Sequence, residues 1–175
     1  MLKSIRSWLG VETTAAPEHA PLREVLDALD HLDTSRAQYL ARFAYLLGRV
    51  ARADDSVSPD ETRAMESLLV RHGQLSENQA MLVVGLAKTS NLLFGGTADF
   101  IVAQEFNDSA SYEQKLALAR CLFAVAATDE RISINEEAEL YRVTNQLHIE
   151  APDLVKIRLE HKRFLPGLAP PGPQK

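Results

Sequence analysis

An internal repeat constrains the fold of this chain more than any other feature of its sequence. When the sequence is aligned with itself at an offset of 75, residues 43–61 match residues 118–136. Seven of these 19 pairs are identical: Ala44/Ala119, Leu47/Leu122, Val50/Val125, Ala51/Ala126, Asp54/Asp129, Ser58/Ser133 and Glu61/Glu136. Because the identity includes polar positions, it exceeds what two amphipathic helices share through their apolar stripes alone. The repeat predicts two pseudo-symmetric helical hairpins that bury their apolar faces against each other.

Apolar residues recur at helical spacing along the whole central part of the chain. Helices are expected around 22–29, 39–50, 59–69, 77–86, 98–106, 112–127, 134–147 and 151–162. Pro59 suits a first helical position, and Thr34 or Ser35 is expected to cap the helix that follows it. No stretch shows a strand alternation that a helix does not explain better. The expected fold class is all-α, with about seven or eight helices.

The two ends of the chain differ in composition from its centre. Residues 1–20 are expected to form a short amphipathic helix and a linker, and residues 21–164 to form the helical domain. Residues 165–175 contain four prolines and two glycines and predict a disordered tail. The N-terminal helix has two open interpretations: weak contact with a membrane surface, or packing on its own domain.

Charge and composition exclude several classes of protein. A net charge of −5 and only 6% aromatic residues argue against a nucleic-acid binder. The chain has neither the apolar core of a signal peptide nor 18 consecutive apolar residues, so a cytoplasmic protein is expected. The single cysteine, Cys121, lies on an apolar stripe and is expected in the core, and the five histidines show no ligand spacing. We therefore expect no catalytic residue and no enzymatic activity.

Each copy of the repeat contains an acidic turn between its two helices. Ser58 and Glu61 form a capping box in the first copy, as do Ser133 and Glu136 in the second. Asp54 and Asp129 have no such explanation, because each follows the C-terminal end of a helix, where a negative charge is disfavoured. A repeated aspartate in that position calls for a partner: a capping N–H group, an arginine or a cation.

An ordinary EF-hand does not fit either turn. When Ile132 is aligned with the apolar position of a calcium loop, Val125 and Ala127 occupy the first two ligand positions. Two turns brought together by pseudo-symmetry would still offer four to six carboxylates to one divalent cation, whether Ca²⁺, Mg²⁺, Mn²⁺ or Zn²⁺. The candidate ligands are Asp54, Asp55, Glu61, Asp129, Glu130 and Glu136.

The arrangement resembles the TerB-like tellurite-resistance family, which is related to the N-terminal domain of the DjlA co-chaperones. The family pattern is an apolar helix followed by Ala-Asp-Gly-x-Ile-x-x-x-Glu, repeated twice in one all-helical domain. Its aspartate falls on Asp54 and Asp129, and its glutamate falls on Glu61 and Glu136. The family glycine is replaced by Asp55 and Glu130. Since glutamate tolerates a left-handed backbone less well than glycine, the second turn is expected to differ in shape.

The resemblance implies a stress-response role through metal sensing, or as an adaptor at the inner membrane, and it implies no catalytic mechanism. Three hypotheses follow from it and from the residues. The first is a binding module whose paired acidic turns hold a cation and whose surface engages a protein partner. The second is a protein-interaction domain without a metal, in which the carboxylates are only caps and surface charge. A metal-dependent enzyme is the least favoured, because the sequence shows no cleft and no catalytic set.

Overall fold

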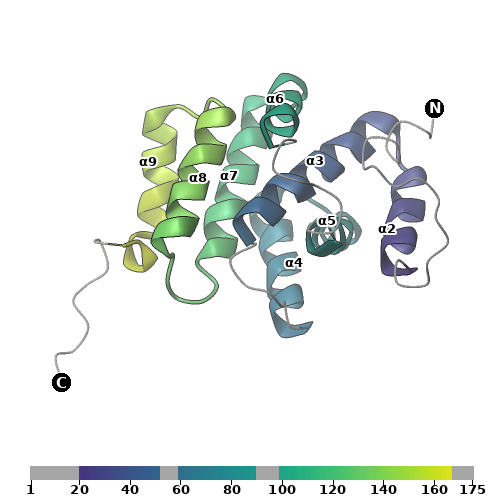
Figure 1. The fold of residues 1–175 in the computed structure, drawn as a ribbon, viewed down its shortest axis with the longest axis horizontal. Coiled ribbons are helices and arrows are strands. Elements are labelled where there is room, and N and C mark those ends of the chain that lie inside the picture. Colours follow the sequence, from purple (N-terminus) through teal and green to yellow (C-terminus); the bar gives the residue numbers. More distant parts are fainter. Residues whose placement is uncertain (1–19, 52–58, 90–98, 167–175) are drawn as a thin grey trace.

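The computed structural model describes residues 20–51, 59–89 and 99–166, and within these ranges the chain forms eight α-helices and no strand (Figure 1). This confirms the all-α class. The helix predicted at residues 1–10, its linker and the tail from residue 167 lie outside the described residues. The helices are α2 (Ala20–Asp30), α3 (Thr34–Ala51), α4 (Pro59–Gly73), α5 (Glu77–Thr89), α6 (Asp99–Ser109), α7 (Tyr112–Ala126), α8 (Ile134–Gln146) and α9 (Ala151–Glu160), followed by the 3₁₀ turn η4 (Lys162–Phe164).

Local sequence explains where the helices start. Helices α5, α7 and α8 each begin with a capping box, in which a serine hydroxyl accepts from the N–H three residues later while a Gln or Glu side chain accepts from the serine N–H. Helix α4 begins at Pro59, as predicted. The predicted cap of α3 is wrong: Asp33, and neither Thr34 nor Ser35, accepts from the Arg36 N–H at 2.9 Å. An aspartate at this position serves as well as a hydroxyl residue.

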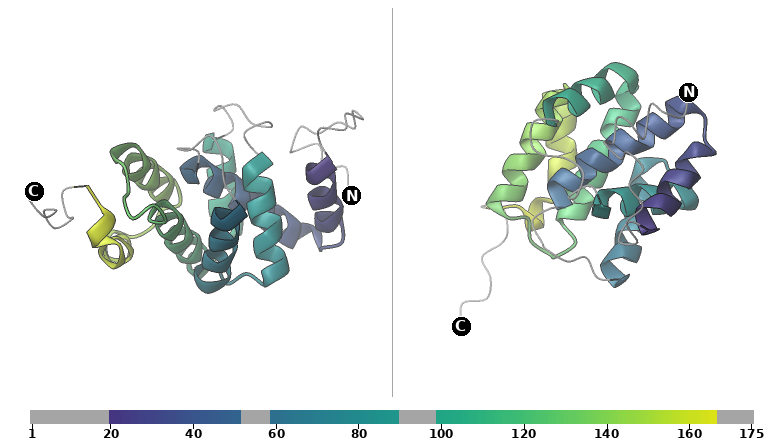
Figure 2. Two further views of the ribbon diagram at one scale, coloured as in Figure 1. Left: turned by 90° about the horizontal axis from the view of Figure 1, so that it is seen from below. Right: turned by 45° about the vertical axis from the view of Figure 1, so that its right-hand side comes forward.

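The two copies of the repeat pack directly against each other within one helical domain (Figures 1 and 2). Helix α3 of the first copy packs against its counterpart α7 at the centre of the domain. Helix α4 packs against α7, and α8 packs against α3, so the second helix of each copy lies on the first helix of the other. Because each second helix contacts the first helix of the other copy, the two copies share one core. Two hairpins that packed only within themselves would form two separate cores.

The duplicated unit also includes a third helix. Gln74 after α4 and His148 after α8 both adopt a left-handed backbone, with φ of 55° and 54°. Each is followed by a buried aliphatic residue, Leu75 or Ile149, and then by the next helix. Helix α5 packs on α3 as α9 packs on α7. Gln74 and His148 are separated by 74 positions, so an alignment at a fixed offset of 75 does not pair them. The third helix of the unit is therefore not apparent from that alignment.

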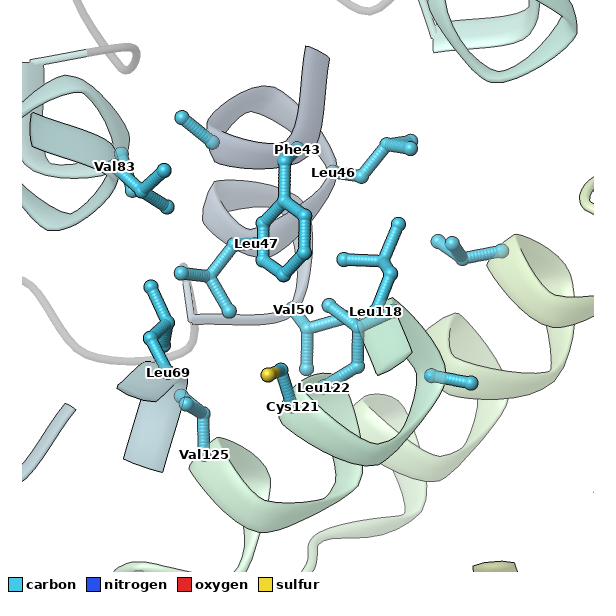
Figure 3. Packing of buried hydrophobic residues seen from close by; sticks show 14 of the residues in the cluster. Phe43, Leu46, Leu47, Val50, Leu69, Val83, Leu118, Cys121, Leu122 and Val125 are labelled. Atoms are coloured by element: carbon cyan, nitrogen blue, oxygen red, sulfur yellow. The ribbon is translucent and has the colours of Figure 1, made fainter. Parts of the chain in front are cut away.

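The core receives buried residues from all eight described helices, and Figure 3 shows the part of it between α3, α4, α5 and α7. Phe43, Leu47, Leu118 and Leu122 are fully buried there. Cys121 is also fully buried, as predicted, and burial raises the pKa of its thiol to about 12, so the thiol stays protonated. A Cβ atom on Gly73 would lie only 3.0 Å from the Cys121 Sγ atom, so the end of α4 approaches α7 closely.

Candidate functional site

The described residues include four of the six predicted carboxylates. Asp54 and Asp55 lie outside the described residues, and Glu61 is exposed in the first turn of α4. Asp129 and Glu130 are exposed in the connection between α7 and α8, and Glu136 is half-buried in the first turn of α8. The structure therefore places three of the six candidates in one continuous turn.

Helix directions bring the start of α4 to the same end of the domain as that turn. The end of α4, at Gly73, approaches the middle of α7, whereas Leu69 lies beside Val125 near the α7 C-terminus (Figure 3). Helices α4 and α7 are therefore antiparallel, and the first turn of α4 points toward the α7–α8 connection. Both lie at the lower edge of Figure 1. The carboxylate of Glu61 thus belongs to the same end of the molecule as those of Asp129 and Glu130.

Glu130 adopts a left-handed backbone, with φ of 57°. The Glu130 N–H donates to the Ala127 carbonyl at 3.2 Å, and the Thr128 hydroxyl donates to the Val125 carbonyl at 2.7 Å. The expectation that Glu130 would change the shape of the turn is wrong at this residue, because it takes up the conformation that glycine would favour. The hydrogen bonds of the turn hold the glutamate in that conformation against its intrinsic preference.

The capping box predicted in the second turn is confirmed. Glu136 Oε2 accepts from the Ser133 N–H at 2.7 Å, and the Ser133 hydroxyl accepts from the Glu136 N–H at 3.2 Å. One oxygen of the Glu136 carboxylate is therefore already engaged. A cation would share this side chain with the cap or displace the Ser133 N–H. The corresponding box of the first copy includes Ser58, which lies outside the described residues.

Over the ranges that the structure describes, no three His, Cys, Asp or Glu side chains are arranged to hold a metal ion. The predicted ligand set is not tested by this finding, because Asp54 and Asp55 fall in the gap between α3 and α4. Four of the six candidates lie in the described residues: Glu61, Asp129 and Glu130, which are exposed, and Glu136, which is half-buried in its capping box.

Replacing Glu130 with glycine is expected to raise the free energy of unfolding by about 0.5–1 kcal/mol. A left-handed backbone is unfavourable for a residue with a Cβ by about 1–2 kcal/mol, and the greater chain entropy of glycine offsets part of this gain. Chemical denaturation measures the change. Glu130→Ala is the matched control, because it removes the carboxylate but keeps the Cβ atom. An equal gain in both variants would contradict the backbone explanation.

A buried charged cluster that was not predicted from the sequence lies between α3, α6 and α8. The Arg49 side chain is only 2% exposed, and its guanidinium lies 2.6 Å from Glu139 Oε1 and 3.7 Å from Asp99 Oδ2. Arg49 Nη1 also donates to Gln146 Oε1 at 2.9 Å. The Tyr45 hydroxyl donates to Asp99 Oδ1 at 2.5 Å. These contacts hold the start of α6 and the middle of α8 against α3.

The charged cluster breaks the symmetry of the repeat. At the offset of 75, Arg49 corresponds to Ala124 and Glu139 corresponds to Ala64, so neither partner has a charged counterpart in the other copy. The sequence does contain one indication of this cluster. Arg49 is a charged residue three positions after Leu46, on an otherwise apolar stripe. A buried charge without a partner is unfavourable, so such a residue predicts a hidden carboxylate.

Two histidines lie near one another at the ends of α4 and α9. Burial lowers the pKa of His161, with smaller effects from Glu160, His72 and Arg163. His161 stacks on the Phe123 ring with centroids 6.2 Å apart. Burial also lowers the pKa of His72, with further effects from Arg71, Glu160 and Arg120. The fold therefore favours the neutral form of both imidazoles.

Stability is expected to fall as the pH is lowered through and below about 6.5, the usual pKa of histidine. In that window the unfolded chain takes up protons at His72 and His161 that the folded chain binds less readily, so protonation favours unfolding. Thermal melts between pH 5 and pH 7.5 measure this effect. His161→Gln is expected to flatten the pH profile, whereas the exposed His31 serves as the control through His31→Gln. Equal profiles for wild type and His161→Gln would contradict the account.

The fold defines a class of all-helical domain built from a duplicated unit, with an acidic turn between α7 and α8 in the second copy and the matching acidic sequence at residues 54–61 in the first. The profile of the family described as tellurite resistance protein TerB matches residues 40–159, which include both acidic turns and the core helices. The chain belongs to the TerB family. Searches among curated proteins and among solved structures returned no match. Among the described helices, none combines the length and apolar character required to cross a membrane.

Proposed function

We propose that this tellurite-resistance-type domain is a non-enzymatic binding module for stress response, which holds a divalent cation between its two acidic turns. The observation that carries this proposal is the placement of exposed carboxylates at one end of the domain. Asp129 and Glu130 are exposed there, and the first turn of α4, with Glu61, points to the same end. Membership of the TerB family supports the proposal, because both copies of the family motif fall within the matched region.

The chemistry of the candidate ligands favours a hard or borderline cation. Carboxylate oxygens are the preferred ligands of Ca²⁺ and Mg²⁺, and they also bind Mn²⁺ and Zn²⁺. Closely spaced carboxylates repel one another, and a divalent ion relieves this repulsion. We infer that Asp54, Asp55 and Glu61 complete the site from the first turn.

The second candidate is a protein-interaction domain that binds no metal. The specific observation in its favour is the capping box, in which the Glu136 carboxylate already has a hydrogen-bonded role. Both candidates involve a protein partner and a cytoplasmic location, and the first includes peripheral association with the inner membrane. A metal-dependent enzyme is the least favoured alternative, because the sequence shows no catalytic set beside the carboxylates.

The two candidates are separated by replacing both repeated aspartates. The double variant Asp54→Ala/Asp129→Ala is expected to keep the helical circular dichroism of the wild type and to lose any cation response. The matched control is Glu24→Ala/Asp108→Ala, which removes two exposed carboxylates outside the turns. Isothermal titration with Ca²⁺, Mg²⁺, Mn²⁺ and Zn²⁺ measures binding for all three proteins. Undiminished binding by the double variant would refute the assignment of the site and favour the metal-free domain.

A further inference from the structure

The second acidic turn contacts the chain that follows α9. The Ile132 N–H donates to the Phe164 carbonyl at 2.8 Å, and this hydrogen bond joins the turn to η4. Leu165, which composition assigns to a disordered tail, is fully buried in the core. Figure 1 shows η4 beyond the end of α9, at the same end of the domain as the α7–α8 connection. The packed part of the chain therefore extends at least one residue beyond the predicted domain boundary.

This contact is placed to act on the candidate site. Ile132 is fully buried and lies between the left-handed Glu130 and the capping residue Ser133. Its position therefore sets the path of the chain that separates the exposed carboxylates from Glu136. Beyond the turn's own bonds and the capping box, Phe164 supplies a hydrogen bond from a remote part of the chain.

The segment of residues 162–165, called here the C-terminal strap, is held on the domain by few contacts. Leu165 is its only fully buried residue, and Phe164 is half-buried against the core. Lys162 and Arg163 are exposed, and Arg163 stacks over the Phe164 ring at 4.5 Å from its centroid. A short segment held by one buried side chain and few hydrogen bonds opens more readily than the helices of the core.

We propose that the C-terminal strap regulates the second acidic turn: when docked it holds Ile132 and keeps the turn in the shape that binds the cation, and when released it weakens binding. The effect on cation affinity rests on the proposed function, whereas the effect on the turn does not. By linkage, a cation that favours the ordered turn strengthens strap docking by the same factor. The strap therefore couples the occupancy of the site to the chain that follows residue 166.

Amide hydrogen exchange at Ile132 tests the strap directly, because its N–H is the donor of the hydrogen bond to Phe164. In Leu165→Ala, exchange at Ile132 is expected to accelerate at least about tenfold relative to the amides of α7, which report global opening. Leu159→Ala is the matched control, since Leu159 lies on α9 with its side chain 55% exposed. Leu165→Val is a milder variant should the alanine variant lose its fold. Unchanged relative exchange in the Leu165 variant would overturn the proposal.

Cation titration of the same proteins separates this proposal from the proposed function. Leu165→Ala is expected to bind the cation at least about fivefold more weakly than wild type, and Leu159→Ala to bind it equally well. If wild type binds and Leu165→Ala binds equally well, the strap proposal fails while the proposed function stands. If wild type binds no cation, the proposed function fails, and the coupling to affinity fails with it. Exchange at Ile132 then decides whether the strap controls the turn.

Discussion

Replacing Arg49 with leucine is expected to lower the free energy of unfolding by about 3 kcal/mol. Breaking a buried ion pair from one side typically costs about 3–5 kcal/mol, because the remaining charge stays buried without its partner. We expect a loss at the lower end of this range, because Glu139, whose side chain is 15% exposed, keeps its ion pair with Arg142. Asp99 likewise keeps the hydrogen bond from Tyr45. Chemical denaturation, monitored by circular dichroism, measures the loss.

Two further variants test the cause of that loss. Arg49→Leu/Glu139→Leu is expected to return to within about 1 kcal/mol of the wild type, since an apolar pair of similar volume avoids the cost of burying charge. Arg142→Ala removes the exposed partner of the same carboxylate and is expected to change stability by about 0.5 kcal/mol or less. A double variant no more stable than Arg49→Leu would show that packing, and not the unpaired charge, causes the loss.

Leu47→Ala and Leu122→Ala are each expected to lower the free energy of unfolding by about 2–5 kcal/mol. The two leucines occupy identical positions in the two copies, and both are fully buried in the core that α3 and α7 share. Because α4 and α8 each pack on the central helix of the other copy, each deletion is expected to destabilise the whole domain. Unfolding should remain a single transition in both variants.

Thermal and chemical unfolding, followed by circular dichroism and by tyrosine fluorescence, measure these two variants. Leu159→Ala, on the exposed side of α9, is the control and is expected to change stability by about 0.5 kcal/mol or less. Two separate transitions, with only one of them shifted by Leu122→Ala, would contradict the single shared core.

The helical elements were predictable because their signals are local. The capping box of Ser133 and Glu136 and the proline at the start of α4 depend on residues within one helical turn. The cap of α3 was not predictable in the same way. Asp33, Thr34 and Ser35 are three adjacent residues that can each cap a helix, and the choice depends on where the backbone turns.

The charged cluster and the strap depend on contacts that no local pattern contains. Arg49 and Glu139 are separated by 90 positions, and their pairing follows from the packing of α8 on α3. The hydrogen bond from Ile132 to Phe164 joins two backbone groups, so no side chain indicates it. Leu165 was assigned to the tail because prolines and glycines follow it, although its own side chain is apolar enough to enter the core.

For the candidate site, the sequence predicted the residues but not their geometry. The repeat indicated both acidic turns, and the structure places Asp129 and Glu130 on the surface with Glu136 in its cap. The left-handed backbone of Glu130 was not expected from a glutamate, because its conformation is imposed by the bonds of the surrounding turn. The ligand set therefore remains a prediction, and its test is the binding of a cation by the folded chain.

A thermal melt of the purified chain with chelator, and then with millimolar Ca²⁺, Mg²⁺, Mn²⁺ or Zn²⁺ added singly, tests the central claim most directly. A cation at about 100 times its dissociation constant stabilises the folded state by about 2.7 kcal/mol. For a domain of this size, the midpoint is expected to rise by about 5–10 °C with one of the four ions. Unchanged midpoints with all four ions would contradict a cation site and leave the carboxylates as caps and surface charge.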